Sequence, residues 1–359
     1  MDKTPRCILL LQNATKSENT YKNYFYNLNR FRKHFKIKDF DSLLEIDSKK
    51  INEMLEDWLM YLRKKVSPNS IPTMYYGTEL FFAMNDVTIN SKKLRRMLPA
   101  KVKRSGANPW KTEDAQKMLS ACRCKRDKAI VLFLSSTGSR IGSIDGLKIK
   151  HIIEMPFGCK AVWVYADDKE EYWSFLTPES SKALDEYFKE RIEDGEQLTD
   201  DSPVFRTLYS KKNSQTPKSL MIQSARCVVF RLIKQARIQR KKVGFAFDIQ
   251  ADHGFRKRFN TILKLNNEVN SNIAEKLMGH KRGLDGTYLA PTREECFDEF
   301  KKSMNELMIE ESWRLKVELE KKNDQLDKQQ SDKDNRILKL ESRLVNTEKI
   351  LLELSKRLS

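Results

Sequence analysis

Apolar residues in the first hundred positions recur at intervals of three and four, the spacing of amphipathic helices. In the segment 17–36, for example, Leu28, Phe31 and Phe35 share one helical face with three earlier aromatic residues. The pattern predicts helices within 17–36 and 47–66, from Ile71 to Phe82 and from Leu94 to Leu98, whereas residues 1–14 show no periodicity. We therefore predict an all-helical N-terminal domain over residues 1–104.

A second pattern begins after residues 101–110, where Gly, Asn and Pro interrupt the helical spacing and mark a domain boundary. Two β-rich runs, 161–166 and 171–177, flank the polar turn Asp167–Glu170 and predict a hairpin. The surrounding helices are predicted after an N-cap at Thr112, over the apolar run Ala129–Leu134, from Pro178 to near Gly195, and over 218–236, 255–266 and 271–278. Residues 105–301 thus form a second domain, and the fold class is mainly α with a small antiparallel β-sheet.

The remaining segment, residues 302–359, contains neither Pro nor Gly and is predicted to form one or two long helices. Before it, Thr292 and Glu295 have the spacing of a capping box. Towards its end the apolar residues follow a heptad pattern, which Thr347 interrupts: Ile337, Leu340, Leu344, Leu351, Leu354 and Leu358. The pattern predicts a coiled coil that self-associates. The alternative is a single helix docked on the second domain.

The charge of the chain indicates a partner rich in phosphate. Its 359 residues include 68 Lys and Arg against 50 Asp and Glu, a formal net charge of +18. Such a balance favours nucleic acid, DNA or RNA, although solubility alone or attraction to an anionic membrane surface would also account for it. No apolar run reaches the length of about 18 to 20 residues that a membrane span needs, and no secretory signal is present, so we expect an intracellular protein without a membrane partner. The six scattered cysteines predict reduced thiols rather than disulfides or a zinc site.

Positive side chains gather in two short segments that are candidates for contact with DNA. The first contains no acidic residue and ends the N-terminal domain, and the second follows a His-x-x-Arg motif. Together they comprise Lys92, Lys93, Arg95, Arg96, Lys101, Lys103, Arg104, Lys257 and Arg258. Contacts of this kind position a protein on the DNA backbone, whereas base contacts select the site.

Four further motifs place basic or nucleophilic side chains beside glycines or helix ends. Arg140 follows the break at Thr137–Gly138, and His253 and Arg256 stand at i and i+3 on one helical face. His280 follows Gly279, and Tyr288 comes eight residues later. Each of these residues taken alone is more often a structural or capping residue than a catalytic one.

Taken in order, these motifs resemble the signature of the tyrosine recombinases, a family that includes the integrases of phages and archaeal mobile elements. The family has an arginine after a Thr-Gly break, a lysine on a β-hairpin, a His-x-x-Arg pair, a Gly-His and then a tyrosine. Arg140, Lys169, His253, Arg256, His280 and Tyr288 match in that order over about residues 112–300. Two departures stand out: Ser143 occupies a position where a glutamate is common, and the interval from His280 to Tyr288 is eight rather than the more usual nine.

The resemblance implies an all-helical core-binding domain, a tyrosine-recombinase catalytic domain and the integration of double-stranded DNA through a 3′-phosphotyrosyl intermediate. Arg140 and Arg256 would clamp the phosphate, because guanidinium groups bind two oxygens at once. His253 and His280 would donate further hydrogen bonds, His253 would also accept the proton of Tyr288, and Lys169 would protonate the leaving 5′ oxygen. The family needs no cofactor, metal or ATP, works as a tetramer on paired sites, and would act in the cytoplasm, on the nucleoid.

Three other readings stay open from the sequence. A type IB topoisomerase uses nearly the same residues to nick and reseal one strand. A non-enzymatic DNA-binding protein would use the basic residues only to grip phosphate. A coiled-coil scaffold would explain residues 302–359 but none of the ordered motifs.

Overall fold

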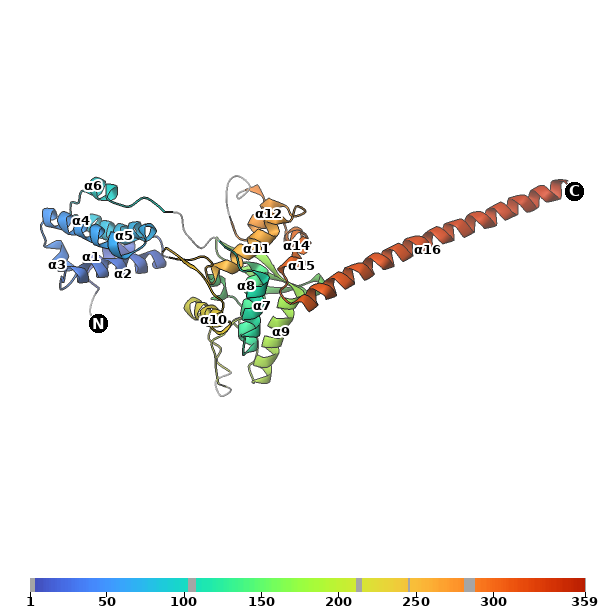
Figure 1. The fold of residues 1–359 in the computed structure, drawn as a ribbon, viewed down its shortest axis with the longest axis horizontal. Coiled ribbons are helices and arrows are strands. Elements are labelled where there is room, and N and C mark those ends of the chain that lie inside the picture. Colours follow the sequence, from blue (N-terminus) through green and yellow to red (C-terminus); the bar gives the residue numbers. More distant parts are fainter. Residues whose placement is uncertain (1–3, 103–107, 211–214, 245, 281–287, 359) are drawn as a thin grey trace. The chain divides into compact units, whose positions relative to one another are not determined.

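The computed structural model describes residues 4–102, 108–210, 215–244, 246–280 and 288–358. Its contacts divide the chain into two compact units, Met1–Ser105 and Gly106–Ser359. The third domain predicted at residues 302–359 does not separate as a unit of its own by this division, and each unit is described by itself below (Figure 1).

The first unit is built from helices in its described part. They are α1 (Arg6–Asn13), α2 (Glu18–His34), α3 (Asp41–Leu44), α4 (Ser48–Lys65), the 3₁₀ turn η1 (Pro68–Ser70), α5 (Ile71–Met84) and α6 (Ser91–Arg96). The four helices expected from the sequence correspond to α2, α4, α5 and α6. Helix α1 is a correction, because a segment of two turns is too short to show a period, yet it buries Cys7, Ile8 and Leu11.

An aromatic cluster forms the core of this unit. Phe31 of α2 makes edge-on contacts with Trp58 of α4 and Phe82 of α5, at ring-centroid distances of 5.9 and 6.1 Å. All three side chains are almost fully buried. Rings of this size bury large apolar areas, so the three longest helices of the unit are held together at one place.

The second unit is mainly helical around a small sheet. Its helices are α7 (Thr112–Ser120), α8 (Lys125–Thr137), α9 (Pro178–Glu193), α10 (Ile222–Gln235), α11 (His253–Leu265), α12 (Ser271–Lys276), α14 (Arg293–Lys302), α15 (Met304–Leu307) and α16 (Glu311–Leu358), with 3₁₀ turns η2 (Ile141–Ile144), η3 (Ile149–His151) and η4 (Pro156–Gly158). The expected caps at Thr177 and Thr292 are present, the latter as a full capping box with Glu295. At α7 the N-cap is Lys111, and Thr112 is already the first helical residue.

Three antiparallel strands form the main sheet, in the order β1 (Ile152–Met155), β2 (Cys159–Val164) and β3 (Tyr172–Leu176). The expected hairpin is β2–β3, with Val162 opposite Ser174. Strand β1 was not expected, and neither was the two-residue pair β4 (Lys242–Val243) and β5 (Ala246–Phe247). Runs this short carry too few alternating residues to be recognised from sequence.

Helix α8 lies at the centre of this unit. Its residues Ala129 to Thr137 are all buried, as expected of a helix with apolar residues on every side. It contacts α9, α11 and β3. Val162 and Leu176 of the sheet join its core, whereas Ala161 and Phe175 face a second core with α14 and α15. The end of α8 is therefore fixed from several directions, and this end positions the first candidate arginine.

The last helix, α16, contacts the rest of the unit near its start. Val317 is buried and Trp313 packs against the second core, while Arg314 donates from Nε to the Met308 carbonyl oxygen at 2.9 Å. Further along, Leu319, Leu326, Ile337, Leu340 and Leu344 are each more than half exposed. The coiled coil remains a prediction at this point. Among the described residues, no helix has both the length and the apolar character that crossing a membrane requires.

Candidate active site

The end of α8 turns sharply at Gly138, which adopts a left-handed conformation with φ of 56°. A Cβ atom at this position would lie 2.4 Å from Phe259 of α11, so only glycine fits. The turn exposes the Gly138 carbonyl oxygen to α11 and leads directly to Arg140, the N-cap residue of η2. Arg140 is exposed, and its side chain accepts no capping hydrogen bond from the backbone of η2.

Arg256 of α11 occupies the centre of the site. Its side chain is buried, and its guanidinium donates from Nη1 to the Gly138 carbonyl oxygen at 2.9 Å and from Nη2 to the Met278 carbonyl oxygen at 2.5 Å. Nη2 also lies 2.8 Å from Nε2 of His280. Burial lowers the pKa of Arg256, and the positive charge of Arg140 acts in the same direction. Arg256 thus joins the ends of α8 and α12 to α11, with a second arginine nearby.

His280 is placed by a second left-handed glycine. Gly279 has φ of 63°, and a Cβ there would lie 2.4 Å from the ring of Tyr172 on β3. The backbone N–H of His280 donates to the Glu275 carbonyl oxygen at 3.0 Å, and Nδ1 of its ring meets the Glu275 carboxylate. The chain therefore folds back after α12 so that the imidazole lies between Glu275 and Arg256.

These neighbours determine where the proton of His280 lies. A carboxylate only accepts hydrogen bonds and a guanidinium only donates them. Nδ1 must therefore carry the proton that faces Glu275, and Nε2 must accept from Arg256. In this arrangement His280 holds Arg256 in position; the phosphate-donor role expected for it would need a proton on Nε2.

Glu275 was missed in the sequence analysis. Although partial burial raises its pKa, hydrogen bonds from Lys264 and His280 outweigh that effect and lower it, so the carboxylate stays charged. Lys264 of α11 forms an ion pair with Oε1 of Glu275, whereas His280 meets Oε2. The only signal in the sequence is an acid five residues before the histidine, across a helix end, and this spacing has no helical periodicity.

His253 begins α11 and is exposed. Partial desolvation lowers its pKa, and the charges of Arg256 and Lys257 lower it further. Arg140 also acts on the His253 imidazole. At neutral pH the ring is therefore uncharged and able to accept a proton.

The β2–β3 turn carries Lys169 at its exposed tip. The turn begins at Tyr165, whose φ is 54° and whose pKa is raised by burial although Arg140 and Arg256 oppose the shift. A Cβ at Gly142 would lie 3.3 Å from the Tyr165 hydroxyl, so the base of the turn packs closely against η2. The hairpin base is thus next to the arginines, and Lys169 projects beyond it.

Tyr288 is 79% exposed. Within the described part of the chain, none of the hydrogen bonds at Arg256 or His280 involves Tyr288. The structure therefore groups Arg140, His253, Arg256 and His280, and leaves Lys169 and Tyr288 on the surface.

The candidate DNA contacts of the first unit are mostly exposed. Lys92, Arg96 and Lys101 are open to solvent, whereas Lys93 pairs with Glu56 and Arg95 forks onto Glu79 at 3.1 and 3.2 Å. Lys103 and Arg104 lie outside the described residues. The ion pair of Lys93 is partly exposed and can exchange for phosphate, whereas the buried carboxylate of Glu79 holds Arg95 more firmly.

Arg258 is a correction to the expected DNA contacts. Its guanidinium is buried and donates to the carbonyl oxygens of Leu307 at 3.1 Å and Glu306 at 2.8 Å, and to Oγ1 of Thr112 at 3.2 Å. Burial lowers its pKa to about 10. The side chain therefore fastens α11 to α7 and α15, while Lys257 beside it is half-buried with a pKa lowered by burial.

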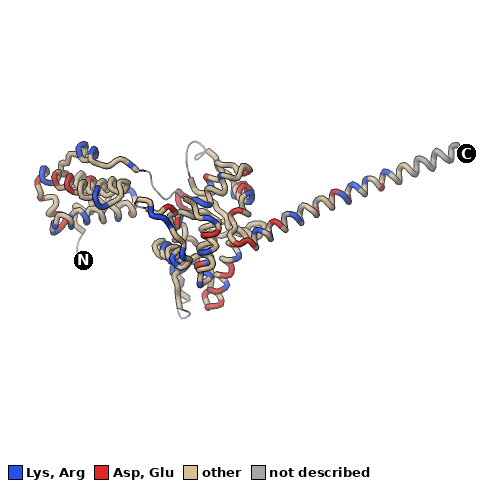
Figure 2. The backbone as a smooth tube through the Cα atoms, viewed as in Figure 1, with Lys and Arg blue, Asp and Glu red and all other residues tan. Residues whose placement is uncertain are grey.

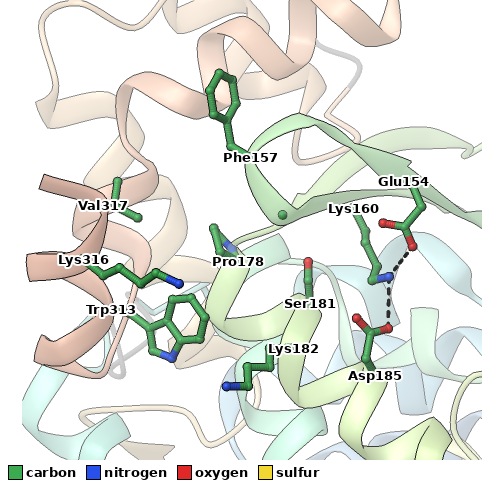
Figure 3. A pocket seen from close by; sticks show the side chains of 11 residues that line it. Glu154, Phe157, Lys160, Pro178, Ser181, Lys182, Asp185, Trp313, Lys316 and Val317 are labelled. Carbon is green, nitrogen blue, oxygen red and sulfur yellow. Dashed lines mark hydrogen bonds and ion pairs between the residues drawn. The ribbon is translucent and has the colours of Figure 1, made fainter. Parts of the chain in front are cut away.

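A separate cavity lies where α16 begins, between the sheet and α9 (Figure 3). Its volume is about 470 Å³, and Lys160 in its wall bonds to Asp185 at 3.0 Å and to Glu154. None of the six candidate catalytic residues lines this cavity. Among the described residues, no three His, Cys, Asp or Glu side chains group as a metal site would require.

Comparison with known proteins identifies the family of one domain. Residues 108–284 match the model of the phage integrase family, a range that includes Arg140, Lys169, His253, Arg256 and His280 and ends before Tyr288. No curated protein matches the chain. Among solved structures, the XerH site-specific recombinase bound to difH substrate is 18% identical with a TM-score of 0.53, over 78% of this chain and 80% of that chain.

A lambda integrase dimer bound to a COC′ core site is 15% identical with a TM-score of 0.51, over 79% of this chain and 92% of that one. At these identities the likeness shows a shared fold. The match of residues 108–284 shows that this part of the chain is a phage integrase family domain, and the solved structures that share its fold are recombinases and integrases.

Proposed function

We propose that this protein is a site-specific recombinase that breaks and rejoins DNA of a mobile element, with Tyr288 as its nucleophile. The observation that carries the proposal is the buried guanidinium of Arg256, held between two carbonyl oxygens and His280 with Arg140 beside it. Two neighbouring positive charges repel each other, and a phosphate between them would remove that repulsion.

In the proposed reaction, the Tyr288 oxygen attacks the phosphorus and the bond to the 5′ oxygen breaks. His253 accepts the tyrosine proton, because its lowered pKa leaves the imidazole neutral. Lys169 gives a proton to the leaving 5′ oxygen. Arg140 and Arg256 neutralise the charge that grows on the nonbridging oxygens. The phosphotyrosyl bond conserves the energy of the phosphodiester, so rejoining runs the same steps in reverse without metal or ATP.

Tyr288 is suited to this role by its exposure. An exposed phenol can reach a phosphate that lies outside the protein, whereas a buried one could not. The basic residues of the first unit would hold the DNA by its backbone. The related structures on DNA, the XerH complex with difH and the lambda integrase dimer on its core site, support both the substrate and an assembly of several copies.

The test uses a nicked duplex that carries the attachment sequence of the encoding element. Cleavage near the nick releases a short strand, so religation fails and the covalent adduct accumulates. We expect the full-length protein to form a 3′-phosphotyrosyl adduct, and Tyr288→Phe to lose it while DNA affinity stays within about twofold, because only the nucleophilic hydroxyl is removed. An adduct that persists in Tyr288→Phe would show that another residue is the nucleophile.

A further inference from the structure

The described part of α16 exposes an apolar stripe. Ile337, Leu340 and Leu344 are 51, 52 and 60% exposed, at spacings of three and four along one face. The sequence continues the same spacing at Leu351, Leu354 and Leu358. Because the rest of the second unit does not cover Ile337, Leu340 and Leu344, this stripe is available to another helix.

The charges beside this stripe decide which helix fits it. In heptad notation, Ile337 and Leu344 occupy a positions and Leu340 a d position. The preceding g positions are Arg336 and Arg343, and the e positions are Glu341 and, by sequence, Glu348. Figure 2 shows this mixture of basic and acidic residues along the helix. All g positions named here are basic and all e positions are acidic.

Such an arrangement distinguishes the two orientations of a pair of identical helices. In a parallel pair, each g residue faces the e residue five positions later on the other helix. Arg336 would then face Glu341, and Arg343 would face Glu348, of the second copy. In an antiparallel pair g faces g and e faces e, so that arginine would meet arginine and glutamate would meet glutamate.

We propose that residues 337–358 pair with the same segment of a second copy of this chain as a parallel, in-register coiled coil. The polar residues Asn323, Gln330 and Lys333 fall at earlier a and d positions, so the paired segment begins near Ile337. Parallel pairing places the two catalytic units at the same end of the coil. Two copies can then bind neighbouring DNA sites together, with the coil as a tether between them.

This inference goes beyond DNA cleavage and does not depend on Tyr288. About three heptads give a weak coil, so we expect association that depends on protein concentration. Sedimentation of the full-length protein without DNA measures it directly. Self-association can therefore fail while cleavage succeeds, and the reverse.

Two exposed leucines provide a matched first test. Leu344 is on the stripe and Leu338 is not, although they are 60 and 63% exposed. We expect Leu344→Asp to weaken association more than a hundredfold, because it buries a charge in the seam, and Leu338→Asp to leave it unchanged. Equal effects of the two changes, or a monomer at every soluble concentration of the full-length protein, would overturn the proposal.

Charge exchange tests the orientation. Arg336→Glu and Glu341→Arg should each weaken association about tenfold at low salt, since two attractive pairs become repulsive in each dimer. The double variant should restore it, because attraction returns with the signs exchanged. In an antiparallel pair like charges already face each other, so neither single change would weaken association, and that result would refute the parallel arrangement. Neither residue belongs to the site around Arg256, so adduct formation on a nicked duplex should be unchanged.

Discussion

Helix α11 carries two buried arginines, two residues apart, in very different surroundings. Arg256 and Arg258 both donate to main-chain carbonyl oxygens. A like charge acts on each of them, Arg140 on Arg256 and Arg314 on Arg258. The groups that oppose it differ: they are the phenols of Tyr172 and Tyr165 at Arg256, and the carboxylates of Glu179 and Glu113 at Arg258. Charges balanced inside the protein are structural. Like charges that face phenols instead of carboxylates form a place for an anion, because burial raises the pKa of Tyr165 and Tyr172 and keeps both phenols neutral. This difference distinguishes the two arginines better than burial does.

The same substitution at both positions tests this difference, and the largest effect is expected at Arg256. Arg256→Met should lower single-turnover cleavage by about 10³ to 10⁵, the range for loss of a transition-state arginine in phosphoryl transfer. It should also reduce the salt dependence of DNA binding by about one phosphate contact. Relief of repulsion from Arg140 should offset part of the stability lost with the bonds to Gly138 and Met278. Cleavage within tenfold of the parent rate would remove Arg256 from the site.

At Arg258 the effect should appear in stability instead. Arg258→Met leaves the oxygens of Glu306, Leu307 and Thr112 without their donor, which should cost about 2 kcal/mol. For a unit of this size that corresponds to a fall in Tm of about 4 to 8 °C. Thermal unfolding measures the shift, and DNA titrations at several salt concentrations should show an unchanged slope. A reduced slope with unchanged Tm would mean that Arg258 contacts phosphate after all.

The sequence was sufficient to predict most long helices, the hairpin and the residues that gather at Arg256. Local signals carry these features: Gly138 and Gly279 mark helix ends, and His253 and Arg256 share a helical face. The sequence was insufficient for Arg258. Residues two apart point to opposite sides of a helix, and only the packing of α15 against α11 shows which of these sides is buried. Helix α1 was missed because two turns are too short to show a period.

Glu275 shows the same limit within the site, since a contact across a helix end leaves no periodic trace. Glu275→Gln provides the smallest effect that we predict and the finest test of the arrangement. The amide keeps the size of the carboxylate but loses its charge and can present a donor to Nδ1 of His280. Arg256 would then be held less firmly, and we expect single-turnover cleavage to fall about tenfold, with DNA affinity and Tm nearly unchanged.

Glu268→Gln is the matched control. Glu268 is exposed on the loop before α12, and its replacement by glutamine removes the same charge. It should leave cleavage at the parent rate. A general loosening of the unit would lower Tm, DNA affinity and cleavage together, whereas a positioning role lowers cleavage alone. If Glu275→Gln and Glu268→Gln cleave equally fast, the carboxylate does not hold His280 for the reaction. Arg256 would then owe its position to the carbonyl oxygens of Gly138 and Met278 alone.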